Sequence, residues 1–307
     1  MAVVMEIKDL VIIGAGPAGI TAAVYAARKK MDFTVISRDI GGQAAWAGEV
    51  GNFPGYQFIP GIELAQKFRE HLEKFKFDLK EGEEAVKIEK RDSFFCIRTL
   101  KGEEIFAKTV IIATGKRPRW LNVPGEAKYM RKGVNFCATC DGPLFAGKNV
   151  AVIGGGNSAL DAVLQMMKIA AKVYLINAGE QLGGDAIMQE KVKASPVVEV
   201  LNKTKTLEFT GEQFLKGMKL EVAGAPRSIE VEGAFVEIGL VPNAAFTDLV
   251  KKNELGEIII NTAAETSEPG VFAAGDVTNV PEKQMIIAAG EGAKATLAAF
   301  KYLSTHK

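Results

Sequence analysis

The feature that most constrains the fold is a glycine motif that occurs twice in the chain. Residues 14–19 read GAGPAG, follow an apolar run at 10–13, and precede a segment at 20–27 rich in helix formers. Between a buried strand and a helix, GxGxxG is typical of a dinucleotide-binding turn. Its first glycine permits the turn, its second lets a pyrophosphate approach the backbone, and its third lets helix pack on strand. The motif predicts a Rossmann-type unit at the start of the chain.

A second copy of the pattern begins 140 residues after the first. Residues 154–159 read GGGNSA, with alanine in the third place, and follow the apolar segment NVAVI at 149–153. The strand-before, helix-after setting is again the one that the motif requires. Two fingerprints indicate two nucleotide sites in separate lobes and exclude a dehydrogenase that uses a single cofactor.

The chain is expected to return to its first lobe near the C-terminus. Residues 109–115 (TVIIATG) and 270–276 (GVFAAGD) both read as buried strands that end in small residues and glycine. We therefore predict an α/β protein with two Rossmann-like, three-layer ββα nucleotide-binding domains, the second inserted into the first. The first domain, discontinuous, would span 1–116 and 243–307, and the inserted domain 117–242.

Apolar periodicity predicts the other main elements. In the first lobe we expect a strand at 33–37, a helix at 62–75, an antiparallel meander over 77–106 and a last helix at 286–302. In the second lobe we expect strands at 173–176, 197–201, 217–222 and 233–238. Cys96 alternates with polar residues inside the meander and is predicted to be a buried structural thiol.

Residues 137–142, CATCDG, carry the chemistry of the inserted lobe. Two cysteines separated by two residues can open and close a small disulfide ring, and this arrangement commonly lowers a thiolate pKa. Asp141 follows at once and could exchange the proton that thiol chemistry needs. The alternative is half of a zinc site, which requires about four ligands. With three cysteines and two histidines in the whole chain, a redox role is favoured over a metal site.

Composition excludes several classes of partner. The 307 residues carry 38 basic and 37 acidic side chains, so the formal net charge of +1 gives no reason to expect nucleic acid or an anionic membrane. The N-terminal segment 1–6 has no signal-peptide pattern, and no apolar run has the length of a membrane span. Few cysteines fit a reducing compartment, so a cytoplasmic protein is expected.

In order along the chain, the motifs GxGxxG, GGQ, ATG, CATCDG, GGGNSA and AAGD resemble those of the low-molecular-weight thioredoxin reductases. The resemblance covers residues 9–304 and extends to the flavoprotein subunit of alkyl hydroperoxide reductase without its N-terminal thioredoxin-like extension. It implies a flavin-dependent disulfide oxidoreductase. FAD would pass electrons from a reduced donor to the Cys137–Cys140 disulfide and on to thioredoxin or a thioredoxin-like protein. The resemblance also implies a homodimer in which the two lobes of each chain rotate relative to each other, so that the cysteines face first the flavin and then the partner protein.

The resemblance also implies roles for individual residues. Cys140 would face the flavin, Cys137 would attack the partner's disulfide, and Asp141 would act as the acid. The implied FAD contacts are Gly14, Gly16, Pro17, Ala18, Gly42, Gln43, Asn52, Thr114, Gly275, Asp276, Gln284, Met285 and Ile286. The implied contacts to the nicotinamide nucleotide are Gly154, Gly156, Asn157, Ser158 and Asn177.

One departure from the family pattern bears on the electron donor. NADPH-dependent members follow the strand at 173–176 with a His-Arg-Arg cluster, whereas this chain reads NAGEQLGG, and no arginine lies between Arg131 and Arg227. A 2′-phosphate would lack its bidentate cation. NADH is therefore favoured over NADPH, with Asn177 or Glu180 as candidates to bind the ribose hydroxyls. Ferredoxin or a deazaflavin stays open as another donor.

Other functions stay open from the sequence alone. The acceptor could be a glutaredoxin-like carrier that serves a peroxiredoxin. A flavin-containing redox sensor without turnover is a hypothesis from a different class. A relative of ferredoxin–NADP reductase is disfavoured, because such proteins normally lack the CxxC pair.

Overall fold

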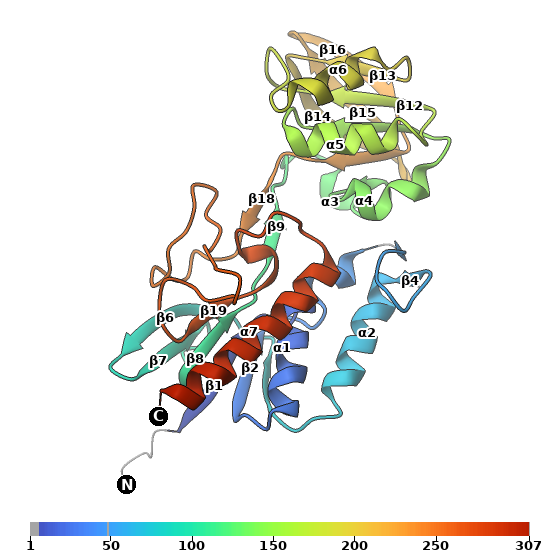
Figure 1. Ribbon diagram of the computed structural model, residues 1–307. Coiled ribbons are helices and arrows are strands. Elements are labelled where there is room, and N and C mark those ends of the chain that lie inside the picture. The colour runs from blue at the N-terminus through green and yellow to red at the C-terminus, as the bar shows by residue number, and fades with distance from the viewer. Residues whose placement is uncertain (1–5, 48, 307) are drawn as a thin grey trace. The chain divides into compact units, whose positions relative to one another are not determined.

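The computed structural model describes residues 6–47 and 49–306 and divides the chain into two compact units (Figure 1). Unit 1 comprises Met1–Trp46, Val50–Arg117 and Val241–Lys307, and unit 2 comprises Ala47–Glu49 and Pro118–Leu240. The statements below concern the described residues of each unit. The expectation of no signal peptide concerns mostly residues 1–5, which lie outside the described residues. Which cofactor each unit binds stays a prediction.

Unit 1 is built on a mixed sheet in the order β5-β2-β1-β8-β7-β6, with β19 also paired to β8. The strands are β1 (Ile7–Ile13), β2 (Phe33–Ser37), β5 (Asp78–Glu81), β6 (Ala85–Arg91), β7 (Phe94–Thr99), β8 (Glu104–Ile112) and β19 (Val271–Ala273). The pairs of β1 with β2 and β8, of β2 with β5, and of β8 with β19 are parallel. Several strands therefore end at one edge, where the glycine-rich segments follow.

Helices cover one face of this sheet. The unit contains α1 (Pro17–Arg28), α2 (Gly61–Leu72) and α7 (Met285–Thr305), and Figure 1 shows α7 running beside α1. Because side chains alternate along a strand, Leu10 and Ile12 of β1 pack in the cluster that contains α1 and α7. Val11 and Ile13 pack on the opposite face, against β6 and β7 and the apolar part of 244–258.

Short elements complete unit 1 and the connections between the units. They are η1 (Gly42–Trp46), β3 (Glu49–Val50), β4 (Ile59–Pro60), β9 (Lys116–Pro118), β18 (Leu240–Pro242) and η3 (Gly275–Val277). Strands β9 and β18, which carry the two chain connections, pair with each other as a two-stranded sheet.

Unit 2 contains a parallel sheet in the order β10-β17-β11-β12-β13 and an antiparallel sheet β14-β15-β16. The strands are β10 (Val134–Asn135), β11 (Asn149–Ile153), β12 (Lys172–Ile176), β13 (Val198–Leu201), β14 (Thr204–Gly211), β15 (Leu215–Val222), β16 (Ala225–Glu230) and β17 (Gly233–Val236). The helices are α3 (Glu126–Tyr129), α4 (Ala138–Asp141), η2 (Gly142–Phe145), α5 (Asn157–Met166) and α6 (Ala186–Ala194).

The core of unit 2 lies in two layers, one on each face of the parallel sheet. Val150 and Val152 of β11 pack with Leu160 of α5, whereas Ala151 of the same strand packs with Phe209 of the antiparallel sheet. This sheet–sheet–helix arrangement is the predicted ββα architecture. The fold class, two Rossmann-like domains with the second inserted into the first, is confirmed.

Three differences between the predicted and the observed elements concern more than a few residues at an end. The segment 77–106 is an antiparallel meander only from β6 onward, since β5 pairs with β2 in parallel. The predicted helix at 62–75 ends at Leu72, after which backbone turns take over. Strands β14 and β16 were not predicted, because polar residues on both faces hide their alternation.

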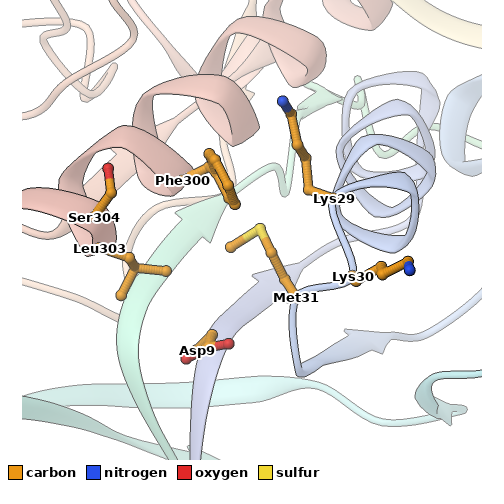
Figure 2. A pocket seen from close by; sticks show the side chains of 7 residues that line it. All are labelled: Asp9, Lys29, Lys30, Met31, Phe300, Leu303 and Ser304. Carbon is orange, nitrogen blue, oxygen red and sulfur yellow. The ribbon is translucent and has the colours of Figure 1, made fainter.

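A small hollow of about 190 Å³ lies at the C-terminal end of α1 (Figure 2). The Lys29 ammonium lies 4.8 Å from the centroid of the Phe300 ring, and Met31 reaches into the space between α1 and α7. Because the glycine turn lies at the other end of α1, this hollow is separate from the predicted nucleotide site. No helix among the described residues is both long and apolar enough to cross a membrane.

The close contact between α7 and α1 leads to a first prediction. A Cβ at Gly292 would lie 2.0 Å from the Ala18 carbonyl oxygen, whereas one at Gly290, two residues earlier on the same helix, would meet nothing within 4 Å. Gly292→Ala should therefore lower the free energy of unfolding by about 1–3 kcal/mol through overpacking. Gly290→Ala should be neutral or stabilising, because alanine favours a helix. Chemical denaturation of both variants measures the difference, and equal stabilities would contradict this packing.

Candidate redox centre and nucleotide cavity

The first glycine turn joins β1 to α1 and leaves open space where a pyrophosphate would bind. Gly14 has φ +105°, and a Cβ on Gly19 would lie 1.8 Å from the Gly14 carbonyl oxygen, so both positions require glycine. A Cβ on Gly16 would meet nothing within 4 Å. Gly16 is also the N-cap of α1, whose first backbone N–H groups and positive dipole end favour an anion. The turn therefore fits a dinucleotide phosphate.

Most of the other predicted FAD contacts lie around this turn. A Cβ on Gly42 would lie 3.2 Å from the Gly16 Cα atom, and one on Gly275 would lie 3.0 Å from the Ala18 Cβ atom. Pro17 opens α1, directly after the N-cap. Segments far apart in the sequence thus meet at the edge of the sheet where β1 and β19 end.

The uncharged polar side chains among the predicted FAD contacts form hydrogen bonds within unit 1 that fix their positions. The Asn52 amide donates to the Gln284 side-chain oxygen at 3.1 Å, next to Met285 and Ile286 at the start of α7. The Gln43 amide donates to the Lys116 carbonyl at 2.9 Å. The Thr114 hydroxyl donates to the Asn243 carbonyl at 2.6 Å, so its role is partly structural.

Asp276 is the charged member of the predicted FAD set. Burial raises the pKa of its carboxyl, and the charges of Lys283 and Lys116 oppose that rise. Within the described residues no hydrogen bond reaches this half-buried carboxylate, although Lys116 and Lys283 both bind the neighbouring Glu257. A carboxylate with open acceptor sites at the end of β19 suits a ligand hydroxyl, as the ribityl chain of FAD would offer. The residues of unit 1 therefore fit FAD.

Unit 2 contains a cavity of about 660 Å³ at the corresponding sheet edge. The residues that follow β11, β12 and β17 all line it, as do residues of the unpredicted strand β14. Parallel strands place their carboxyl ends together, which is where α/β proteins bind ligands. The lining comprises Leu121, Val123, Ile153–Ser158, Ile176–Ala178, Lys205, Thr206 and Glu237–Gly239.

All of the residues predicted to contact the nicotinamide nucleotide line this cavity: Gly154, Gly156, Asn157, Ser158 and Asn177. A Cβ on Gly156 would meet nothing within 4 Å, so the second glycine again leaves room for a pyrophosphate. The Asn177 amide already donates to Asn202 and to the Gly179 carbonyl, and its oxygen accepts from the Gly179 N–H. The other candidate, Glu180, forms an exposed ion pair with Lys203 at 2.6 Å.

Three lining residues with polar or charged side chains were not found from the sequence. Lys205 and Thr206 lie on β14, whose existence was not predicted, so no pattern marked them. Thr206 is buried, and its hydroxyl has no hydrogen-bond partner within the described residues, as expected of a site that accommodates a polar ligand. Glu237 directly follows β17. The sequence did offer a signal for this residue, because an acidic side chain at the carboxyl end of a predicted parallel strand is a candidate to bind a ligand. The cavity therefore fits a nicotinamide dinucleotide.

The two cysteines lie in unit 2 at the short helix α4. Cys137 and Cys140 form a disulfide with a Cα–Cα distance of 5.3 Å, and Cys137 is the N-cap of α4, where its sulfur accepts from the Cys140 N–H at 3.1 Å. Both cysteines are half-buried, and Asp141 is buried at the end of the same helix. The structure thus brings the predicted catalytic residues together in one helical turn.

Cys96 is the remaining cysteine, and it is a buried free thiol on β7 in unit 1. Burial raises its pKa, which disfavours the reactive thiolate. The prediction of a buried structural thiol is confirmed. Across residues 6–47 and 49–306, no three His, Cys, Asp or Glu side chains gather in an arrangement that could hold a metal ion.

Two dinucleotide-type units and a CxxC disulfide are the features that define the class of flavin-dependent disulfide oxidoreductases. The chain belongs to the pyridine nucleotide-disulphide oxidoreductase family, whose sequence model matches residues 8–292. Membership implies FAD and a nicotinamide dinucleotide as cofactors.

Individual members of the family are similar to this chain over nearly its whole length. The chain is 43% identical over 302 residues to the F component of alkyl hydroperoxide reductase in Pseudomonas aeruginosa, and 40% identical over 298 residues to an NADH dehydrogenase of Bacillus subtilis. Each match covers 96% of this chain and 58% of the relative, so the chain spans little more than half of their length. Thioredoxin reductase of Streptococcus pyogenes is 36% identical, with a TM-score of 0.91 and coverage of 97% of this chain and 99% of that one. The resemblance inferred from the motifs is confirmed.

The open space at Gly156 provides a test of the cavity. Gly156→Ala should keep the fold, because φ is −96° and a Cβ there has no neighbour, yet the methyl group would occupy the phosphate position. We expect NAD⁺ binding to weaken by about 10- to 100-fold, the usual cost of overpacking. Calorimetric titration measures the affinity, and an unchanged melting temperature and FAD content serve as controls. Undiminished binding would place the pyrophosphate elsewhere.

Proposed function

We propose that the protein reduces the disulfide of thioredoxin or of a thioredoxin-like small protein, with NADH as the preferred electron donor and FAD as the relay. The observation that carries the proposal is the Cys137–Cys140 disulfide, held in the same unit as a nucleotide-sized cavity. The similarity of the whole chain to a thioredoxin reductase supports this choice of acceptor. The resemblance also supports a homodimer and a cytoplasmic location.

The chemistry balances with the groups that the chain supplies. Reducing the Cys137–Cys140 disulfide takes two electrons and two protons and yields two thiols. Bound FAD would supply two-electron transfer between the nicotinamide and this disulfide. The Cys137 thiolate then attacks one sulfur of the partner's disulfide and forms a mixed disulfide. Attack of the Cys140 thiolate on the Cys137 sulfur releases the partner as a dithiol and restores the ring.

Asp141 is the proposed proton donor for this exchange. Each attack expels a partner thiolate, and protonation of that thiolate prevents the reverse reaction. Asp141 follows Cys140 directly and is buried at the end of α4, the helix that Cys137 caps and that contains Cys140.

Serine variants of the cysteines test the function. Cys137→Ser and Cys140→Ser should each reduce NADH-dependent turnover of thioredoxin by more than about 10³-fold, the usual effect of losing a nucleophile. FAD content and flavin reduction by NADH should persist in both. Cys96→Ala is the matched control and should retain turnover, because Cys96 is buried in unit 1 and is not part of the disulfide. Full activity of either serine variant would refute the proposed route.

Three features of the chain support NADH. The loop after β12 has no arginine, and within the described residues the nearby lysines are already paired, Lys203 with Glu180 at 2.6 Å and Lys205 with Glu221 at 3.6 Å. A lysine is also a poorer partner than arginine for a planar, bidentate contact. The Bacillus subtilis relative carries the name NADH dehydrogenase.

Stopped-flow flavin reduction tests the choice of donor. At equal concentrations below saturation, NADH should reduce the flavin about 10-fold or more faster than NADPH, because the 2′-phosphate lacks a charge-assisted partner. Reduced ferredoxin and a reduced deazaflavin are run in parallel. Faster reduction by any of these three would replace NADH as the proposed donor.

A second acceptor is favoured by the similarity to the F component of alkyl hydroperoxide reductase. In that case the dithiol would pass electrons to a separate glutaredoxin-like carrier that reduces a peroxiredoxin. Measuring turnover with thioredoxins and glutaredoxin-like proteins of the host side by side separates the two. If no such protein is reduced while NADH still reduces the flavin, both acceptors are wrong.

A further inference from the structure

Glu237 occupies a place in the unit 2 cavity to which no role has yet been given. It follows β17 directly, and together with Ile238 and Gly239 it forms one side of the cavity lining. The backbone N–H of Ala138 faces the Glu237 carboxylate and favours its charged form. A carboxylate offers about four acceptor sites. Acceptor capacity is therefore left for a ligand in the cavity.

Sheet order indicates which part of a dinucleotide would reach this carboxylate. β11 carries the glycine turn, where the pyrophosphate binds, and it lies between β12 and β17. In Rossmann units the adenosine ribose lies at the end of the strand that follows the first helix, here β12 with Asn177. The second nucleoside must then lie on the other side of the turn, at the end of β17 beside Glu237.

We propose that Glu237 binds the nicotinamide riboside half of the nucleotide by accepting hydrogen bonds from its ribose hydroxyls or its carboxamide N–H. The inference rests on the proposed nucleotide role of the cavity and adds a specific contact to it. The positive charge of an oxidised nicotinamide would strengthen the interaction. Because Ala138 directly follows Cys137, the same carboxylate contacts both the ligand and the first turn of the disulfide helix.

The surroundings of Glu237 make this contact sensitive to pH. Burial raises the pKa of Glu237 to about 7, the Ala138 N–H opposes the rise, and the charge of Asp161 on α5 adds to it. Other charged groups around the cavity include Asp141 on α4, Lys205 on β14 and Arg119, whose side chain lies next to the lining residue Gly239. Below pH 7 the carboxyl is mostly protonated, and a neutral carboxyl is a weaker acceptor with fewer acceptor sites than the carboxylate. Affinity should therefore fall as the pH falls through 7.

The test measures binding rather than turnover. The FAD-loaded protein is titrated calorimetrically with NAD⁺, which does not reduce the flavin, and with ADP, which lacks the nicotinamide riboside. For the wild type, NAD⁺ should bind about 10-fold more weakly at pH 6 than at pH 8, because roughly a tenth of the carboxyl is ionised at pH 6. ADP binding should change little. ADP-ribose, which keeps the second ribose, separates a ribose contact from a carboxamide contact.

Glu237→Gln keeps the size of the side chain and removes its charge. At pH 8 it should bind NAD⁺ about 10-fold more weakly than the wild type, show no change between pH 6 and pH 8, and bind ADP normally. Glu232→Gln, at an exposed acid just before β17, is the matched control and should behave as the wild type.

The outcomes are separable. Equal weakening of NAD⁺ and ADP in Glu237→Gln, or a pH dependence that survives the substitution, would overturn the role of Glu237. If the wild type bound neither NAD⁺ nor ADP, the proposed nucleotide role of the cavity would fail instead. Far-UV circular dichroism and FAD content of the variant distinguish these results from misfolding.

Discussion

Both units depend on backbone segments that approach more closely than a side chain would allow. In unit 1, Gly19 lies against the Gly14 carbonyl, and Gly292 of α7 lies against the Ala18 carbonyl of α1. In unit 2, a Cβ on Gly154 would lie 2.3 Å from the Glu237 carbonyl oxygen. These contacts bring each helix N-terminus to the carboxyl edge of its sheet, where backbone N–H groups can meet phosphate. The predicted nucleotide sites thus depend on glycine packing.

The same constraint explains what the sequence could predict. A turn that needs glycine at fixed spacing between an apolar strand and a helix leaves a local pattern, so both turns were predicted. The observed strand β2 matches its predicted bounds, and β11 begins one residue before the strand predicted at 150–153. The CxxC pair is local as well, and elimination of other ligands favoured a redox role. Cys96 was placed correctly because alternation marks a buried strand position.

What the sequence could not supply depends on residues that are brought together only by the fold. Buried and exposed residues alternate at the start of β14, but polar residues occur at both kinds of position, so the sequence shows no alternation of apolar and polar residues there. Lys205 and Thr206 could therefore not be placed in the cavity. Asn177 occupied the expected position, but its contact to Asn202 forms only when the segment after β13 folds back on the loop after β12. The parallel pairing of β5 with β2 is equally non-local.

In unit 2 the nucleotide cavity and the helix that carries the disulfide both adjoin Glu237. The Glu237 backbone contacts the glycine turn at Gly154, and its side chain faces both the cavity and Ala138 of the disulfide helix. A displacement of this residue would therefore change the phosphate turn, the cavity wall and the first turn of α4 together. A reduced nicotinamide delivers a hydride, which carries two electrons and one proton, whereas reduction of a disulfide consumes two protons. The second proton must enter from water or from an acid near the sulfurs. The Glu237 carboxyl, whose pKa burial raises to about 7, lies against the first turn of α4, and Asp141 lies at the end of the same helix, so two acids are placed at the helix that carries the disulfide.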